Sequence, residues 1–468
     1  MKCYTRTLAT ALLSTSCLAM ASAPSFALDL PTAQKYEMGP LGDWYLSGGV
    51  SGFVAGWNHN TPFTLNPPGP GAVAQPGASS LNGDASISNA MFILNSKGNM
   101  FGSVPLQMHA WVGIPPNTPV MGYTSPNVSP NLHALGSDAN GFGHTSPLFK
   151  GWATYQPLDW LSIEGGRLPS PDGTEIGVDF LNPTVFLSDL NNMQTTVADG
   201  AQVNFIAGGD KAFYYGFLPG YGSTLTVRLA DGYKTGHPNE LGFTGLWNLN
   251  PDGSSAIVAF GHTRLNPSGS VAGDASSGTG RVAGFGTVNA DLAGIGAFYN
   301  IGALMISPEA EYQWLPKSAI PASARLATGQ DYYNVAAQVT FSYDFGLVNM
   351  FGEPIRLGFA VQPQFIYQHG DSADPNQQAL GNFLGLNTGD PLSLGTFGAG
   401  SRMYGIQANP TFQFHNFFVR PAVSYTRLGS IQPGFGYGAT GNSHDQFVGL
   451  LEVGFLLGQQ MDTSTGQH

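Results

Sequence analysis

The sequence is short of charge and has no cysteine after residue 17. Only 10% of its residues are Asp, Glu, Lys or Arg, whereas soluble domains usually carry about a quarter. Because Cys3 and Cys17 lie near the start, the rest of the chain offers no disulfide, thiolate zinc site, c-type haem attachment or cysteine nucleophile. Basic residues are also few, 17 against 29 acidic ones, which argues against nucleic acid as a partner.

Long apolar runs are missing as well. After Ala27 there is no uninterrupted apolar stretch of about 18 residues, so the sequence offers no helical membrane span. Aromatic residues nevertheless make up 12% of the chain. This composition predicts strands that share one apolar face toward lipid. Such strands must close into a barrel, because an open sheet edge in lipid leaves backbone groups unpaired.

The first 27 residues have the features of a secretory signal peptide. Lys2 and Arg6 precede an apolar core from Leu8 to Met20, and Ser25-Phe26-Ala27 offers small residues for cleavage. We therefore expect residues 1–27 to be removed on export, residues 28–458 to form the barrel and residues 459–468 to form a polar tail.

Apolar and polar residues alternate with period two, most clearly in the C-terminal half. Between Tyr333 and Phe345, for example, apolar residues alternate with Asn334, Gln338 and Thr340. The runs are longer than the usual strand of a globular protein. Their length suits a membrane strand, because about 11 residues of a tilted strand cross an apolar band about 25 Å tall. Aromatic residues lie near many strand ends, as interfacial girdles require.

The pattern predicts an all-β fold, a transmembrane antiparallel up-and-down β-barrel of about sixteen strands. Short and long connections alternate, and an even strand count returns both termini to the periplasm. The expected strands are 43–57, 87–96, 101–114, 147–156, 160–168, 199–207, 211–231, 239–249, 254–264, 281–299, 303–315, 331–345, 354–369, 400–414, 417–427 and 445–457. Pro308, Pro363, Pro410 and Pro421 fall inside these runs, where we expect β-bulges because proline cannot donate to the ladder.

Residues 169–198 show no strand periodicity. A connection of that length indicates a functional loop, and we expect this third loop to fold into the lumen and narrow the pore. Its candidate constriction residues are Asp172, Glu175, Asp179, Asp189 and, at the preceding strand end, Arg167.

Two arrangements of these acids are open. They could face Arg356 or Arg420 across the pore, giving a transverse field and a mild cation preference. They could instead lie in a solvated external loop. For Arg167 we favour a local role, as partner of Glu164 or Asp172.

Sixteen strands leave an aqueous channel, so the inward faces would form its wall. The candidate lining residues are Arg228, Glu309, Glu311, Arg356 and Arg420. Glu309 and Glu311 lie two apart on one strand and point the same way, which would suit an acid–base pair or a cation site. In a wide, water-filled lumen we expect both to be simply ionised.

No motif predicts a cofactor, a metal or an enzyme. The ten histidines lack zinc-motif spacing, and His109 is expected to be a polar lining residue. No G-x-x-x-x-G-K phosphate loop and no G-x-S-x-G nucleophile elbow occur.

One block of sequence resembles a known family. Ile163-Glu-Gly-Gly-Arg-Leu-Pro-Ser-Pro-Asp-Gly-Thr-Glu175, followed by Asn182-Pro183 and Ala198-Asp-Gly200, is similar to the signature region of the OmpL-like group of outer-membrane β-barrel porins. The run from Ala303 to Leu315 is similar to a later strand of that group. The resemblance implies a passive channel in a Gram-negative outer membrane. Asp172 and the C-terminal tail depart from the pattern, and the group supplies no solute.

The favoured hypothesis is an outer-membrane porin for small hydrophilic solutes or ions, in contact with outer-membrane lipid, with a homotrimer as the assembly considered. Two alternatives stay open. An outer-membrane barrel enzyme of the hydrolase type would need a serine and a histidine at the lipid boundary. A secreted all-β binding protein would need a second sheet over the apolar faces.

Overall fold

The computed structural model describes residues 28, 31–58, 81–97, 99–114, 121, 148–169, 173–175, 178–188, 190, 194, 197–208, 222–231, 240–250, 255–264, 291–315, 332–350, 352–369, 402–430, 437 and 443–458. The predicted signal peptide and polar tail lie outside these residues. Among the residues described, no helix is long and apolar enough to span a membrane.

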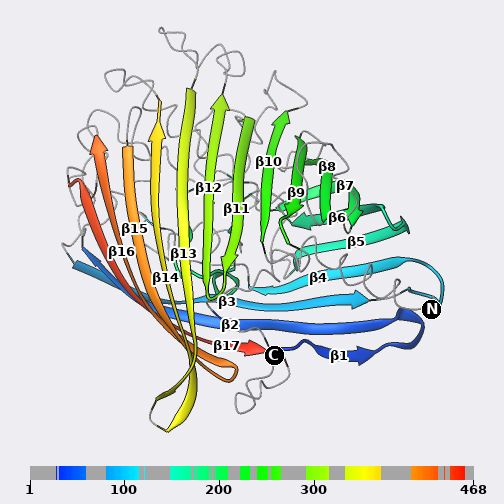
Figure 1. Ribbon diagram of the computed structural model, residues 1–468, viewed down its shortest axis with the longest axis horizontal. Helices are drawn as coiled ribbons and strands as arrows, with labels where there is room; N and C mark the ends of the chain where they lie inside the picture. The colour runs from blue at the N-terminus through cyan, green and yellow to red at the C-terminus, as the bar shows by residue number, and fades with distance from the viewer. Residues whose placement is uncertain are drawn as a thin grey trace, which may run out of the picture.

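Sixteen of the described strands close into an antiparallel barrel. Each strand from β2 to β17 pairs with the next along the chain, and β17 pairs with β2 through contacts such as Leu451↔Val54 (Figure 1). These strands are β2 (Asp43–Asn58), β3 (Leu81–Lys97), β4 (Leu106–Ile114), β5 (Leu148–Leu158), β6 (Leu161–Pro169), β7 (Val197–Gly208), β8 (Gly222–Asp231), β9 (Glu240–Asn248), β10 (Ala256–Arg264), β11 (Asp291–Ile301), β12 (Leu304–Leu315), β13 (Tyr332–Met350), β14 (Glu353–Gln368), β15 (Arg402–Phe414), β16 (Phe417–Ser430) and β17 (Asp445–Leu457).

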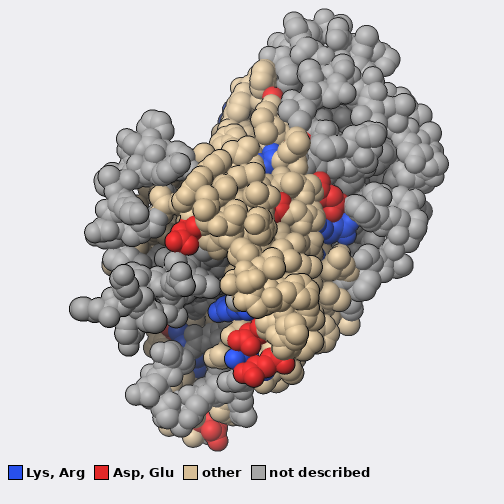
Figure 2. All heavy atoms as spheres, turned by 90° about the vertical axis from the view of Figure 1, so that its right-hand side faces the viewer, with Lys and Arg blue, Asp and Glu red and all other residues tan. Residues whose placement is uncertain are grey.

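The two faces of the strands differ as the sequence predicts. On β15, Tyr404 and Ile406 are each 46% exposed, whereas the alternating Gln407 and Asn409 are at most 1% exposed. The apolar side chains therefore point outward and the amides point into the lumen, because successive residues face opposite sides of a strand. The face in Figure 2 is mostly uncharged, with separate groups of charged side chains that lie most densely near its lower end. Closure excludes the two-sheet arrangement that a secreted binding protein would need.

Strand boundaries depart from expectation in a few places. β13 continues to Met350 and β14 begins at Glu353, so the expected connection from Gly346 to Glu353 shortens to a tight turn. This hairpin projects beyond its neighbours (Figure 1). The start of two expected strands, 211–221 and 281–290, lies outside the described residues. A short strand, β1 (Gln34–Glu37), was not predicted; it pairs with the start of β2.

The bulges expected at the prolines are wrong. Pro410 and Pro421 face each other across β15 and β16, and the pairing passes from Ala408↔Val423 to Phe412↔Val419 with the register unchanged. Each proline stays in register with its other neighbouring strand, Pro410 with Phe359 and Pro421 with Leu451. Between β15 and β16, hydrogen bonding therefore pauses at the two prolines, which have no N–H to donate, and resumes in the same register without the extra residue of a bulge.

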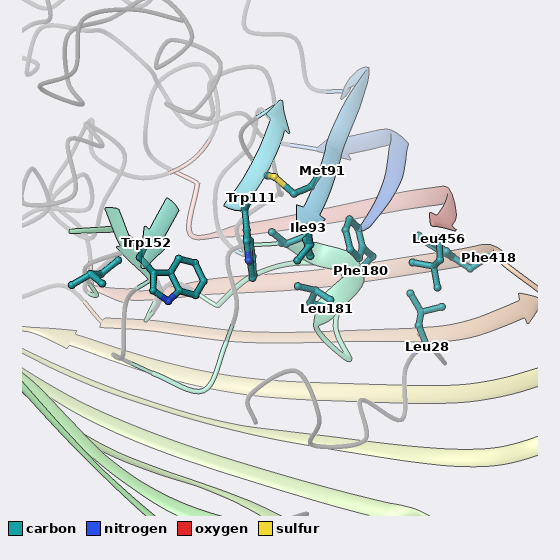
Figure 3. Close-up of a cluster of buried hydrophobic side chains, with 11 residues drawn as sticks. Leu28, Met91, Ile93, Trp111, Trp152, Phe180, Leu181, Phe418 and Leu456 are labelled. Carbon is teal, nitrogen blue, oxygen red and sulfur yellow. The ribbon is translucent and has the colours of Figure 1, made fainter. Parts of the chain in front are cut away.

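Part of the lumen wall is apolar. Met91 and Ile93 on β3, Trp111 on β4 and Trp152 on β5 point inward and are buried (Figure 3). The expected wall of amides, hydroxyls and charges therefore covers only part of the circumference, and the apolar part needs a partner inside the barrel.

Candidate functional site

The partner is the third loop, which lies inside the lumen as predicted. Its described part, within residues 173–194, contains a 3₁₀ turn, η4 (Asp179–Leu181). Phe186 donates its backbone N–H to Gln407 Oε1 at 3.1 Å, and Gln407 Nε2 donates to the Phe186 carbonyl at 2.7 Å. Because Gln407 points inward from β15, these two bonds place the loop against the inner wall.

Apolar side chains of the loop fill the space beside the wall. Phe180 and Leu181 pack with Met91, Trp111 and the N-terminal Leu28 (Figure 3). Further along, the loop packs in two more buried clusters. Val185 and Phe186 join Phe53, Trp57 and Met121, and Leu190 joins Val258 and Phe260.

A second loop reaches the same region. Met121 is fully buried, and its backbone N–H donates to the Leu187 carbonyl at 2.9 Å. The sequence alone gave no sign of this contact, because the surrounding connection is rich in glycine, proline and serine.

Polar contacts hold the middle of the loop. Asn409 Nδ2 donates to the Pro183 carbonyl at 3.1 Å, and Arg420 Nη1 donates to the Asn182 carbonyl at 2.9 Å. These bonds satisfy loop carbonyls that would otherwise be buried without a partner.

Glu175 is the loop acid whose side chain the structure describes. Its carboxylate accepts bonds from the Ser188 backbone N–H at 2.9 Å, from Ser188 Oγ at 2.5 Å and from Gln362 Nε2 at 2.7 Å. The pKa of Glu175 is raised to about 7, mainly by burial and in part by the neighbouring Glu309, against the lowering effect of its hydrogen bonds with Ser188 and Gln362. Glu175 therefore titrates near neutral pH.

Glu309 and Glu311 also meet the loop. Thr174 donates its backbone N–H and its hydroxyl to Glu309 Oε2, at 3.1 and 2.5 Å. Gln194 Nε2 donates to Glu309 at 2.7 Å and to Glu311 at 2.5 Å. Glu309 and Glu311 are each only 3% exposed, so the expectation that they lie in open water is wrong.

The arginines have partners on neighbouring strands. Arg167 Nε lies 3.2 Å from Asp199 Oδ1 on β7, a partner that the sequence did not predict; Asp172, one of the two acids expected for it, lies outside the described residues. The other three pairs are Arg228 with Glu240, Arg356 with Asp344 at 2.5 Å, and Arg420 with Glu452 at 2.6 Å.

The predicted opposition between loop acids and wall arginines is therefore not what the described residues show. Arg356 and Arg420 form their ion pairs along the wall, and Glu175 meets Gln362. The physical reason is register, since antiparallel pairing places Arg420 directly opposite Glu452. Asp172 and Asp189 lie outside the described residues, and for Asp179 only the backbone, in η4, is described.

Several residues that form this site were missed by the sequence analysis. They are Thr174, Asn182, Ser188, Gln194, Gln338, Gln362 and Asn409, all neutral. Period-two alternation predicts only that the strand residues among them face the lumen, and it names no partner for them. The apolar content of the loop was a usable signal, because Phe180, Leu181, Val185, Phe186 and Leu187 are too many for a solvated connection. His109 lies on the wall, stacked on Trp152 at 4.7 Å and bonded to Asn95 at 2.8 Å.

No family model and no curated protein sequence matches the chain. Among solved structures, the chain is similar to Pseudomonas putida OprB at 12% identity, covering 88% of this chain and 94% of that one, with a TM-score of 0.48. It is similar to a BenF-like porin from Pseudomonas fluorescens Pf-5 at 10% identity, covering 90% and 100%, with a TM-score of 0.40.

The chain is also similar to the outer membrane protein OmpT of Vibrio cholerae, solved in a trimer form, at 8% identity, covering 88% and 99%, with a TM-score of 0.42. Likenesses this distant carry no conclusion about activity. The fold follows from the strand pairing of the chain itself.

Proposed function

We propose that this protein is an outer-membrane porin, a barrel that lets small hydrophilic solutes or ions diffuse through its lumen. The observation that supports this function is the closed barrel of sixteen strands with an apolar exterior, an amide-rich inner wall and a loop folded against that wall. A barrel of this size encloses more space than its own side chains fill, and the loop narrows that space.

The proposal includes the setting of the barrel. We include cleavage after Ala27 and insertion in a Gram-negative outer membrane. We also include a homotrimeric assembly and membership of the OmpL-like group. Contact with outer-membrane lipid is supported by the exposed apolar side chains, such as Ile406 and Leu451, each 46% exposed.

Single-channel recording tests the function. The full chain, purified in detergent and added to a planar bilayer, should give ohmic conductance steps in KCl. Repeated insertion without conductance, with the folded barrel verified by its far-UV circular dichroism, would contradict the porin. Ester or peptide hydrolysis by the same preparation would favour the barrel enzyme instead.

We further propose that acids at the loop give the channel a mild cation preference. The constriction would comprise Asp172, Glu175, Asp179, Asp189 and Arg167, and the lining would comprise Arg228, Glu309, Glu311, Arg356 and Arg420. The pairing of all four of these arginines with strand carboxylates supports a negative balance, since Glu175 and Glu309 receive neutral donors from the described residues.

Reversal potentials measure that preference directly. In a KCl gradient, Asp179→Asn with Asp189→Asn should lower the cation-to-anion permeability ratio, whereas Glu37→Gln on the exposed β1 should leave it unchanged. An unchanged permeability ratio in the double variant would show that Asp179 and Asp189 do not set the selectivity at the constriction.

A further inference from the structure

Arg402 and Arg427 differ from the arginines that pair with carboxylates of neighbouring strands. Both side chains are exposed, and among the described residues neither forms an ion pair, although Asp445 lies opposite Arg427 in the register. The other arginines whose side chains the structure describes each pair with a strand carboxylate: Arg167, Arg228, Arg356 and Arg420. The guanidinium groups of Arg402 and Arg427 are therefore available to an anion from outside the chain.

Both arginines point away from the lumen. Met403 and Leu428 follow them directly and are buried on the inner face, at 2% and 1% exposed. Because successive residues of a strand face opposite sides, Arg402 and Arg427 lie on the outer face. Arg427 lies opposite Tyr404, which is two residues from Arg402. The two arginines are therefore diagonal neighbours, at a spacing across which long side chains still reach each other.

A glycine leaves the surface beside Arg402 uncovered. The pairing of β15 and β16 shifts next to Arg402, and Gly429 takes up the extra position. A Cβ at Gly429 would lie 3.1 Å from Tyr404 Cε2 and 3.3 Å from Arg402 Cβ, so any other side chain would crowd this surface. On its β14 side, the guanidinium carbon of Arg402 lies 5.7 Å from the ring centroid of Tyr367. Arg402 is thus held over an aromatic ring with room for an anionic group beside it.

Along the same outer face, the arginines give way first to tyrosines and then to apolar side chains. Tyr404 and Tyr425 lie two residues nearer the middle of β15 and β16 than the arginines, and they are 46% and 37% exposed. Ile406 and Val423 follow, each 46% exposed. Tyrosines collect at the boundary between hydrocarbon and water, so the two arginines lie at the level of lipid headgroups.

In the proposed setting, these headgroups belong to the outer leaflet of the membrane. β15 and β16 meet at the short turn His415-Asn416, whereas their other ends adjoin the long connections 369–401 and 431–444. Bacterial barrels keep short turns in the periplasm and long loops outside. The outer leaflet of a Gram-negative outer membrane carries lipopolysaccharide, whose lipid A part bears phosphate groups. Arginine suits such groups, because its planar fork donates two parallel hydrogen bonds to a phosphate.

We propose that Arg402 and Arg427 bind a phosphate of a lipid A-type molecule in the outer leaflet, whose acyl chains lie along the tyrosines and apolar side chains beneath. A lipid is favoured over a soluble anion, because the exposed apolar face continues directly below the two cations. The site rests on the proposed outer-membrane setting. It does not depend on whether the barrel conducts.

A lipid titration followed by native mass spectrometry tests the site. The full-length protein is purified in a non-ionic detergent with EDTA, freed of bound lipid, and titrated with lipid A that carries both phosphates or with the same lipid after their removal. The wild type should bind the phosphorylated form more tightly. Arg402→Gln and Arg427→Gln should each weaken that binding about fivefold, since each removes one cation near a charged headgroup. The double variant should no longer distinguish the two lipids.

Lys97→Gln is the matched control. Lys97 is an exposed cation at the last residue of β3, at the opposite end of the barrel, and its Nζ lies 4.9 Å from the ring centroid of Tyr45. The substitution therefore repeats the change of charge and the loss of an aromatic contact away from the site. It should leave the affinity for lipid A unchanged.

Three results would overturn the site. The first is equal affinity of the wild type for the two forms of lipid A, and the second is a loss of affinity in Lys97→Gln as large as in Arg427→Gln. The third is displacement of lipid A by inorganic phosphate at the same concentration, which would indicate a soluble anion as the ligand. A protein that binds lipid A as expected but gives no conductance would keep this site and contradict only the porin.

Discussion

Glu175 joins the loop to the wall through a carboxyl group whose charge depends on pH. Its pKa rises from an ordinary 4.5 to about 7, mainly because of burial. We call the loop closed when it packs against the wall and open when it does not. Between pH 4.5 and 7, Glu175 binds more protons in the closed state than in the open state. The stability of the closed loop is therefore greatest below pH 4.5 and falls as pH rises toward 7.

The loss of closed-loop stability at higher pH gives a prediction for the backbone amides of the loop. Hydrogen exchange within residues 178–188, corrected for intrinsic rates, should be faster at pH 8 than at pH 5 in the wild type. Glu175→Gln should flatten that difference, because glutamine stays neutral and its oxygen can still accept from Ser188. Equal pH dependence in wild type and variant would show that another group controls the loop.

The Arg420–Glu452 pair is fully buried, so removing one partner leaves a buried charge. Arg420→Met should lower the free energy of unfolding by about 3 to 5 kcal/mol, measured by denaturant titration in lipid vesicles. Adding Glu452→Leu should restore most of that loss, because the remaining charge is removed. A double variant as unstable as the single one would mean that the bond from Arg420 to the Asn182 carbonyl matters more than the charge.

At the scale of elements, the loop is held by packing as well as by hydrogen bonds. Phe180 is 1% exposed among inward side chains of several strands. Phe180→Ala removes packing of about 3 to 5 kcal/mol. We expect the loop to open more often, with larger and noisier single-channel currents.

The control for this prediction is an aromatic residue on the other face of the barrel. Phe455 on β17 is 48% exposed and points away from the lumen. Phe455→Ala should give wild-type currents. Currents of Phe180→Ala that match the wild type would mean that the polar contacts alone position the loop.

For the whole molecule, the central claim is that lipid covers the exterior. Leu451 lies at the middle of β17 with its side chain outward. Leu451→Arg should lower the free energy of unfolding in lipid vesicles by about 2 to 4 kcal/mol, the cost of a cation near the bilayer midplane. Leu451→Ala is the control, and an arginine no more costly than alanine would place this face outside the hydrocarbon.

The sequence determined the strands, their number and their two faces. Alternation with period two is a local property, so Gln407 and Ile406 could be assigned to opposite sides before any neighbour was known. Closure followed from the same pattern, because lipid on one face leaves no place for an open edge. The apolar residues of the third loop and its entry into the lumen could also be predicted, but the wall residues that they contact could not.

Only the tertiary structure decided what fills the lumen. Thr174 meets Glu309 across 135 residues, and Gln407 meets Phe186 across 221, distances along the chain that no local pattern encodes. Neighbouring strands likewise gave Arg356 and Arg420 carboxylate partners on the wall. Partners were unpredictable because barrel closure brings distant strands around one loop, and that geometry exists only when all sixteen strands are paired.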